Sequence, residues 1–248
     1  MTGSDPAEDS ALPTDGMPHQ IDHRHADVSG GWLRAATFGA MDGLVSNTAL
    51  VAGVGGGGVS SHAIVLTGFA GLISGAISMA LGEYTSVKTQ NEQLDLEVAR
   101  ERAEMERNPR GEVEELAEMI RARGVDPALA DEVAEQLHRD REAALRLHIV
   151  AEVGLSPDDK PSPRTAAISS LVTFSTGAIF PLLPYLFGLS VLWPALVSGG
   201  VGLFIAGALS SRFTPRPWWF AGLRQLLFGA IAAGTTYLIG LAIGSAAG

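Results

Sequence analysis

Five apolar stretches alternate with polar blocks along the chain, and each is long enough to cross a lipid bilayer as a helix. They cover residues 33–54, 63–87, 165–186, 191–211 and 221–245. Pro181 and Pro184 in the third stretch and Pro194 at the start of the fourth are expected to kink or end helices. The pattern predicts an all-α membrane protein with five transmembrane helices, so that the two chain ends lie on opposite sides of the bilayer.

A polar block separates the second and third apolar stretches, and 20 of the 27 acidic residues lie within it, from Glu83 to Asp159. Residues 86–107 contain no Pro or Gly and are expected to continue the second membrane helix beyond the bilayer. Residues 108–111, Asn-Pro-Arg-Gly, should break that helix. A second helix is expected from 112 to about 123 and a third from 127 to about 153. The block therefore predicts a three-helix insert.

The changes in composition divide the chain into four parts. These are a polar tail at 1–31, transmembrane helices 1 and 2 at 32–87, the acidic insert at 88–160, and transmembrane helices 3 to 5 at 161–248. The tail lacks the apolar segment of a signal peptide and is expected to be a disordered cytoplasmic extension. His19, His23 and His25 in the tail are interpreted as solvated polar residues, because no packed neighbours are predicted around them.

The basic residues indicate an orientation in the membrane. All 17 Lys and Arg fall in the N-terminal segment, in the insert, or in the connection between the fourth and fifth apolar stretches. The loops at 55–62 and 187–190 contain none. Because basic residues are retained on the cytoplasmic side, the N-terminus and the insert are predicted to be cytoplasmic and the C-terminus to lie on the opposite side.

The chain contains no cysteine, which excludes disulfides and thiolate metal sites. Any metal site must therefore use carboxylate, imidazole or thioether ligands. No arrangement of a nucleophile and a base is found, and the glycines at 55–58 lie in a predicted external turn rather than before a phosphate-binding helix. Neither an enzyme nor a nucleic-acid partner is predicted.

Asp42 is a lone carboxylate inside the first apolar stretch. Charges at such depth are costly in lipid and occur mostly on ion or substrate pathways, so Asp42 indicates transport. At about 1.5 Å per residue, Asp42 and Met79 lie at matching depths of roughly 12 to 13 Å from the cytoplasmic surface. Glu83 lies one turn nearer the cytoplasm on the face of Met79. Together they form a possible ladder for a divalent transition metal, although Met79 is also a common core residue and Glu83 can be hydrated at the interface.

Carboxylates in the insert recur at spacings that place them on shared helix faces. The sets are Glu97, Glu101 and Glu104; Glu112 and Glu115; and His148 with Glu152. On packed helices these groups can converge on a divalent cation, and the His148 nitrogen suits iron or zinc. The alternative is a solvated acidic face with ordinary ion pairs to interleaved arginines such as Arg100, Arg102 and Arg107. Spacing alone leaves both readings open.

Three segments resemble the vacuolar iron transporter family, particularly its bacterial members: Phe38–Asn47, Gly75–Tyr84 and Glu152–Leu155. The resemblance extends from about Gly31 to the C-terminus. It implies a homodimer in a bacterial cytoplasmic membrane that moves ferrous iron out of the cytoplasm in exchange for protons. It also implies a pathway through Asp42 and Met79, and a cytoplasmic metal-binding domain. The implied ligands of that domain are Glu101, Glu104, Glu112 and Glu115, with Glu152 near the third span.

The chain departs from the plant-type pattern of that family at two positions. His148 stands where the pattern has a methionine, so this candidate ligand is a nitrogen rather than a sulfur. Gly71 stands where the pattern has an acidic residue in the second span, so one pathway carboxylate is missing or is replaced by Glu83. These departures bear on ion selectivity and on proton coupling.

The sequence therefore favours a transporter with Fe²⁺, or Mn²⁺ or Zn²⁺, as substrate and bound ion and with no prosthetic group. Alternating occupancy of Asp42 by metal and proton would give antiport, and a dimer with the pathway near the shared interface suits a wall of only five helices. One alternative is a manganese transporter of the same architecture. The other is a membrane-anchored metal sensor or scaffold that does not transport.

Overall fold

The computed structural model describes residues 31–247, and over that range its regular structure is entirely helical. The predicted tail, apart from Gly31, lies outside the described residues, together with His19, His23 and His25. The elements are α1 Trp32–Gly56, α2 Ser61–Arg107, α3 Pro109–Arg121, α4 Pro127–Leu137, α5 Arg141–Val153, α6 Pro163–Ile179, η1 Phe180–Leu182, α7 Leu183–Leu186, α8 Leu192–Ser210, η2 Ser211–Phe213 and α9 Trp218–Ala247.

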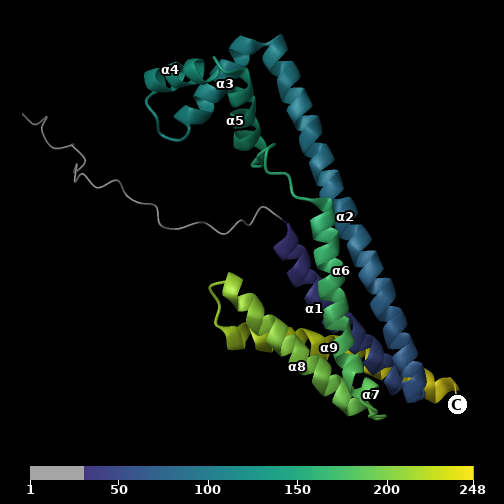
Figure 1. Ribbon diagram of the computed structural model, residues 1–248. Helices are drawn as coiled ribbons and strands as arrows, with labels where there is room; N and C mark the ends of the chain where they lie inside the picture. The colour runs from purple at the N-terminus through teal and green to yellow at the C-terminus, as the bar shows by residue number, and fades with distance from the viewer. Residues whose placement is uncertain (1–30, 248) are drawn as a thin grey trace, which may run out of the picture.

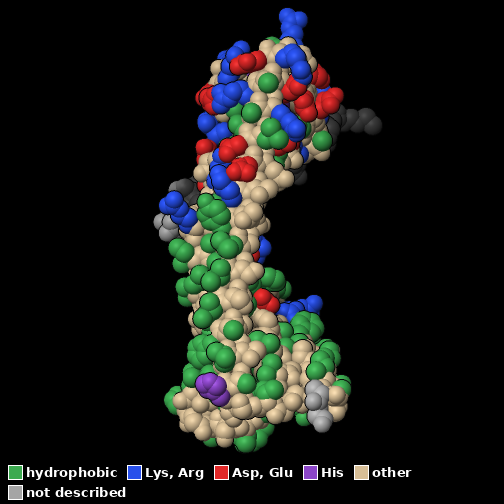
Figure 2. Space-filling model, turned by 90° about the vertical axis from the view of Figure 1, so that its right-hand side faces the viewer, with side chains coloured by type: hydrophobic (Ala, Val, Ile, Leu, Met, Phe, Trp, Pro, Cys, Tyr) green, Lys and Arg blue, Asp and Glu red, His purple; other side chains and the backbone are tan. Residues whose placement is uncertain are grey.

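Helix α2 joins the two parts of the molecule (Figure 1). It contains 47 residues, which corresponds to a length of about 70 Å. Its first half packs with α1 and α6, and its second half carries α3, α4 and α5. Figure 2 shows most of the charged side chains gathered over the end that holds these three helices, and mainly apolar side chains, with a few charged ones, over the rest of the visible face. The predicted continuation of the second apolar helix to Arg107 is confirmed.

Within residues 31–247, four helical segments are long and apolar enough to span a membrane. They are α2, α6 through α7 (Pro163–Leu186), α8 through η2 (Leu192–Phe213), and α9. Helix α1, predicted from the sequence as the first span, is not among them. It carries Asp42, Ser46, Asn47 and Thr48, and it packs against α2, α6, α8 and α9. Since protein surrounds much of α1, its polar residues are compatible with a position inside the helical assembly.

Helices α1 and α6 approach each other backbone to backbone. A Cβ atom added to Gly43 would lie 2.2 Å from the Phe174 carbonyl oxygen, closer than any real contact allows. Small residues that permit such approaches are typical of membrane helix interfaces. The contact places the part of α1 around Asp42 directly beside Phe174 of α6.

The prolines of the third apolar stretch interrupt its helix as predicted. Helix α6 ends at Ile179, and a single 3₁₀ turn precedes the short helix α7. Pro184 has no N–H to donate to the carbonyl of Phe180, four residues earlier. The Ser198 hydroxyl on α8 donates to that carbonyl over 2.6 Å. The hydrogen bond ties the interrupted helix to α8.

Asn108 forms the predicted break between α2 and α3. It ends α2 at Arg107, and its side chain accepts a hydrogen bond from the Gly111 N–H over 3.2 Å. Pro109 occupies the first turn of α3, where a missing N–H has no cost. Helix α3 therefore begins at Pro109, slightly before the expected start at 112.

The prediction of one helix over residues 127–153 was wrong, because the structure contains two. Helix α4 ends at Leu137, and α5 begins at Arg141. The Asp140 carboxylate accepts hydrogen bonds from the N–H groups of Glu142 and Ala143, both over 3.1 Å, and so caps α5. With the extension of α2, the insert thus has four helical segments, one more than the three predicted, because α4 and α5 replace a single helix.

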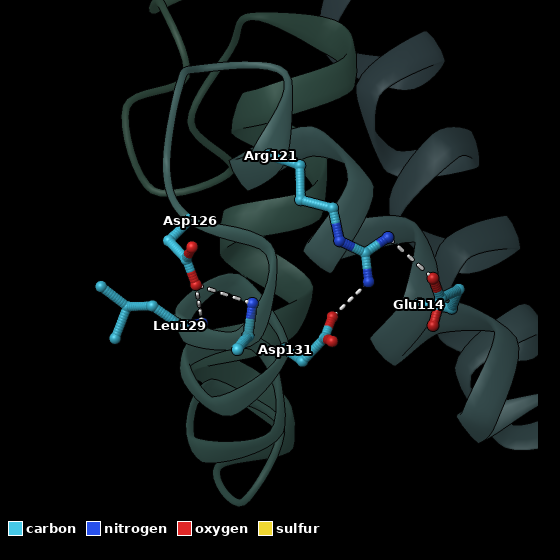
Figure 3. Close-up of polar contacts among 6 residues, drawn as sticks. Glu114, Arg121, Asp126, Leu129 and Asp131 are labelled. Atoms are coloured by element: carbon cyan, nitrogen blue, oxygen red, sulfur yellow. Dashed lines mark hydrogen bonds and ion pairs between the residues drawn. The ribbon is translucent and has the colours of Figure 1, made fainter.

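Helices α3 and α4 pack as an antiparallel pair on a small apolar core, and polar contacts fix them at one end (Figure 3). The Arg121 guanidinium donates to Glu114 over 2.9 Å and also to Asp131, so it bridges the two helices. The Asp126 carboxylate accepts from the Leu129 N–H over 3.3 Å and from the preceding N–H over 3.0 Å. The bridge from Arg121 to Asp131 thus fixes α3 against α4.

Candidate functional site

Three carboxylate side chains from three helices converge around one ring nitrogen, Nδ1 of His148. They come from α2, α3 and α5. The distances from His148 Nδ1 are 3.1 Å to Glu101 Oε1, 3.6 Å to Glu152 Oε1 and 3.8 Å to Glu112 Oε2. The structure therefore unites the predicted His148–Glu152 pair of α5 with one carboxylate from α2 and one from α3.

Apolar packing holds these side chains in place. Leu94 and Met105 of α2 form a buried cluster with Leu145 and Ile149 of α5, which flank His148 in sequence. A bidentate ion pair between Arg102 and Glu142 joins the same two helices at the surface, with N–O distances of 2.5 and 3.1 Å. The apolar cluster and the ion pair therefore both hold α2 against α5 around the site.

Three of the four convergent groups are buried and have atoms without hydrogen-bond partners, whereas Glu152 is exposed. The His148 side chain is fully buried, and Glu101 and Glu112 are only 9% and 6% exposed. Glu101 Oε1, Glu112 Oε2 and His148 Nδ1 accept or donate no hydrogen bond. Buried polar atoms without partners are costly, and a cation placed among them would satisfy all three.

The donor set suits a divalent metal ion. Glu101, His148 and Glu152 can each offer one atom, and these atoms all lie within 4.8 Å of one another. Ligand atoms at about 2.1 Å from a common ion lie at most about 4.2 Å apart, so only small side-chain movements are needed. Carboxylate oxygens with one imidazole nitrogen are acceptable to Fe²⁺, Mn²⁺ and Zn²⁺.

Two of the carboxyl groups are shifted toward their protonated forms. Burial, with the proximity of Glu101, raises the pKa of Glu112 to about 7 from 4.5. Burial likewise raises the pKa of Glu101, and the nearby carboxylates Glu152, Glu115 and Glu104 add to the shift. Without an ion the site therefore retains a proton near neutral pH, which an arriving cation must displace.

Ion binding to the insert is expected to weaken as the pH falls through 7. Below that pH Glu112 is protonated, so the apparent affinity for Mn²⁺ should drop by up to about tenfold per pH unit for each displaced proton.

The stability of the metal-free fold should depend on pH in the opposite direction. Unfolded Glu112 ionises first, so the metal-free protein loses stability as the pH rises from about 4.5 to about 7.

Calorimetric titration with Mn²⁺ at about pH 6 and about pH 8, in buffers of different ionisation enthalpy, measures both the affinity and the protons released. Equal affinity and no proton release at the two pH values would contradict the assignment of Glu112.

Three other predicted ligands lie at the margin of this cluster. Glu97 forms an ion pair with Arg100 over 2.8 Å, and Glu104 pairs with Arg107. Glu115 is exposed, although its negative charge acts on Glu101. The structure thus brings Glu101, Glu112, His148 and Glu152 together and leaves these three outside the group. Their role as ligands stays a prediction.

His138, which the sequence analysis did not consider, contacts the cluster. Its Nε2 lies 3.3 Å from His148 Nε2, on the side of the ring away from the carboxylates. A continuous helix would separate residues 138 and 148 by about 15 Å. The unexpected break at Asp140 folds α5 back and brings the two rings together. The capping residue at 140 was the one signal in the sequence for this contact.

A cavity of about 220 Å³ opens among α1, α2 and α6. Its lining includes Asp42, Ser46 and Asn47 of α1, Gly71, Ser78 and Met79 of α2, and Phe174 of α6. Asp42 and Met79 therefore share one cavity, as their matching depths suggest.

Asp42 has few partners in this cavity. Its carboxylate lies 3.4 Å from the Ser46 hydroxyl, and over residues 31–247 it takes part in no ion pair. The buried Oδ1 of Asn47 also lacks a hydrogen-bond partner, while the Asn47 amide donates to the Ala178 carbonyl. A Cβ atom added to Gly71 would lie 3.3 Å from Asn47 Oδ1, so position 71 faces these polar atoms without contributing a group of its own.

Glu83 lies outside the residues that line this cavity. It is 8% exposed and forms an ion pair with Arg34 Nη2 over 2.9 Å, between α2 and the start of α1. The sequence analysis did not anticipate Arg34 as its partner. The structure thus places Glu83 one turn beyond Met79, with its negative charge balanced by a largely exposed guanidinium.

Comparison with known proteins gives consistent matches along the chain. The model of the VIT family matches residues 33–241, which include the insert and most of the long apolar helices. A protein of Acanthamoeba castellanii named vacuolar iron transporter is 37% identical over 75% of this chain and 72% of its own length. A vacuolar iron transporter of Centaurea cyanus is 34% identical over 90% and 91%, and vacuolar iron transporter 1 of Arabidopsis thaliana is 29% identical over 86% of both chains.

Proposed function

The chain belongs to the VIT family, and from this premise we propose that it carries ferrous iron out of the cytoplasm in exchange for protons. Family membership and apolar helices make it a multi-pass membrane transporter of metal ions and not an enzyme. The observation that carries the more specific proposal is the cavity that Asp42 shares with Met79. It combines a carboxylate and a thioether, with no cation partner for Asp42 within the described chain, between helices that span the membrane.

In the proposed architecture α1 is the fifth span, and the chain forms a homodimer. Support for α1 comes from its contacts with α2, α6, α8 and α9. The end of α9 lies far from the insert in Figure 1, in agreement with a C-terminus on the side opposite a cytoplasmic insert. Ile73, Ile77 and Leu81 expose an apolar face of α2, which a lipid or a second copy can cover. A location in a bacterial cytoplasmic membrane rests on the sequence resemblance alone.

The proposed route begins at the insert, where the cluster around His148 collects the ion. The ion next binds Glu83, and for this the ion or a proton must first displace Arg34 from the Glu83 carboxylate. The ion then reaches Asp42 and Met79 in the cavity. After the ion leaves, Asp42 takes up a proton, because a partly buried carboxylate without a cation is poorly stabilised. The return of that proton to the cytoplasm completes the exchange.

Proteoliposomes test this proposal. Addition of Fe²⁺, kept reduced with ascorbate, is expected to produce uptake of iron and a simultaneous pH change recorded by a dye trapped inside the vesicles. Protein-free vesicles provide the background. Faster transport of Mn²⁺ than of Fe²⁺ would assign the protein to manganese. A complete lack of metal flux would favour the alternative of a membrane-anchored sensor, and iron flux without proton movement would refute the exchange.

A further inference from the structure

The ring contact between His138 and His148 joins the end of α4 to the middle of α5. The two ring planes are nearly perpendicular, at 83°, with their centroids 5.2 Å apart. His148 Nε2 points to His138 Nε2, while His148 Nδ1 faces Glu101, Glu112 and Glu152. The two nitrogens of the His148 ring thus face different partners: Nε2 contacts His138, and Nδ1 contacts the carboxylates.

The hydrogen bond of His138 to the backbone decides where the protons lie. Its Nδ1 is 3.0 Å from the carbonyl oxygen of Ala134, which can only accept. His138 Nδ1 therefore carries a hydrogen, and in a neutral imidazole the other nitrogen, Nε2, is an acceptor. His148 must then donate from its own Nε2. This leaves the lone pair of His148 Nδ1 directed at the carboxylates.

We propose that His138 is a positioning residue for the metal site of the insert. By accepting from His148 Nε2, it selects the tautomer of His148 whose Nδ1 can bind a divalent cation, and it fixes the orientation of the ring. Metal-bound histidines depend widely on an acceptor for their second nitrogen. The inference rests on the proposed function only in that the insert binds a divalent ion.

Burial makes this acceptor necessary. The His148 side chain is fully buried, so water cannot take the place of His138. Without an acceptor, the Nε2–H would be an unsatisfied buried donor, which is unfavourable. The ring would instead favour the tautomer with its hydrogen on Nδ1, where Glu101 can accept it at 3.1 Å. That tautomer has no lone pair for the ion.

His148 stands where the plant-type pattern has a methionine, and this difference explains why a partner such as His138 is needed. The methionine of the plant-type pattern has a thioether sulfur, which carries no hydrogen and has no tautomers. An imidazole ligand brings a second nitrogen that must be satisfied, and His138 satisfies it. His138 should therefore matter only while residue 148 is a histidine, and this condition can be tested.

The test measures Mn²⁺ affinity by calorimetry with the full chain in detergent. His138→Leu removes the acceptor and should weaken binding roughly 10- to 100-fold. His138→Gln keeps an acceptor oxygen and should retain most of the affinity. In a His148→Met background, His138→Leu should cause no further loss. Pulsed EPR of the bound Mn²⁺ should show a coordinated imidazole nitrogen in the unmodified protein and in His138→Gln, but a weaker or absent nitrogen signal in His138→Leu.

The outcomes separate this inference from the proposed function. No Mn²⁺ binding by the unmodified protein would refute the metal site itself. Normal binding by His138→Leu, or an equal loss in the His148→Met background, would overturn the positioning role, because the latter result indicates general structural damage. Thermal unfolding checks that each variant folds. If His138→Leu does not fold, His138→Met, which is apolar but more flexible, provides the same comparison.

Discussion

Asp42→Asn is expected to reduce Fe²⁺ uptake into proteoliposomes to the level of protein-free vesicles. The amide has the size of the carboxylate but can neither attract a cation by charge nor exchange a proton. Asp42 contributes the carboxylate in the cavity with Met79, and Gly71 supplies no second one. The loss should therefore be close to complete, and Mn²⁺ binding to the insert should be unchanged.

The matched control is Asp95→Asn. Asp95 is exposed on the extension of α2 and pairs with Lys160, so the same chemical change there should leave transport unaltered. Ser46→Ala is a second comparison, because the 3.4 Å contact between its hydroxyl and Asp42 is long and should contribute little. Transport by Asp42→Asn at the unmodified rate would remove Asp42 from the pathway.

Glu101→Gln is expected to lower the Mn²⁺ affinity of the insert by at least about a hundredfold, since loss of an outer partner alone costs roughly 10- to 100-fold. Glu101 supplies the carboxylate oxygen nearest to His148 Nδ1 and is 9% exposed. The neutral amide also places a hydrogen-bond donor among the ligands. Calorimetry measures the affinity. Iron flux should fall at low iron concentration but persist at high concentration, because Asp42 remains intact.

Glu97→Gln is the control on the same helix. Its carboxylate lies one turn from Glu101, is 41% exposed and pairs with Arg100. Both glutamates were equally plausible ligands from their spacing, but only Glu101 lies in the buried cluster. Affinity should therefore change less than about threefold in Glu97→Gln, within the usual size of a surface ion-pair effect. Equal losses in both variants would show that the ion lies elsewhere.

The long helix α2 and its end at Asn108 could be predicted because their signals are local. A run without Pro or Gly continues a helix, and an Asn-Pro pair ends it. The break at Asp140 was missed because strong helix formers on both sides outweighed a single capping residue. The number of helices in the insert, and the contact of His138 with His148, depended on that one residue.

Parts of the candidate sites could be predicted where they depend only on the spacing of residues along a helix. His148 and Glu152 share a face of α5 at four residues apart, and helical rise matched the depths of Asp42 and Met79. The choice of Glu101 over Glu97, and the pairing of Glu83 with Arg34, depend on how helices distant in sequence pack. Spacing carries no information on such packing, because each face of α2 offers carboxylates of similar character.

The unbroken course of α2 has a mechanical consequence. Met79 and Glu101 lie on one helix, about 33 Å apart; Gly82 lies between them, and no Pro or Gly occurs between Glu83 and Arg107. Sharp bends in helices arise mostly at such residues, so this segment behaves as a stiff rod. We expect that an ion drawing α3 and α5 toward Glu101 would tilt this segment, with Gly82 between it and the wall of the cavity beside Asp42. We therefore expect ion binding to the insert to be felt along α2 toward the cavity beside Asp42.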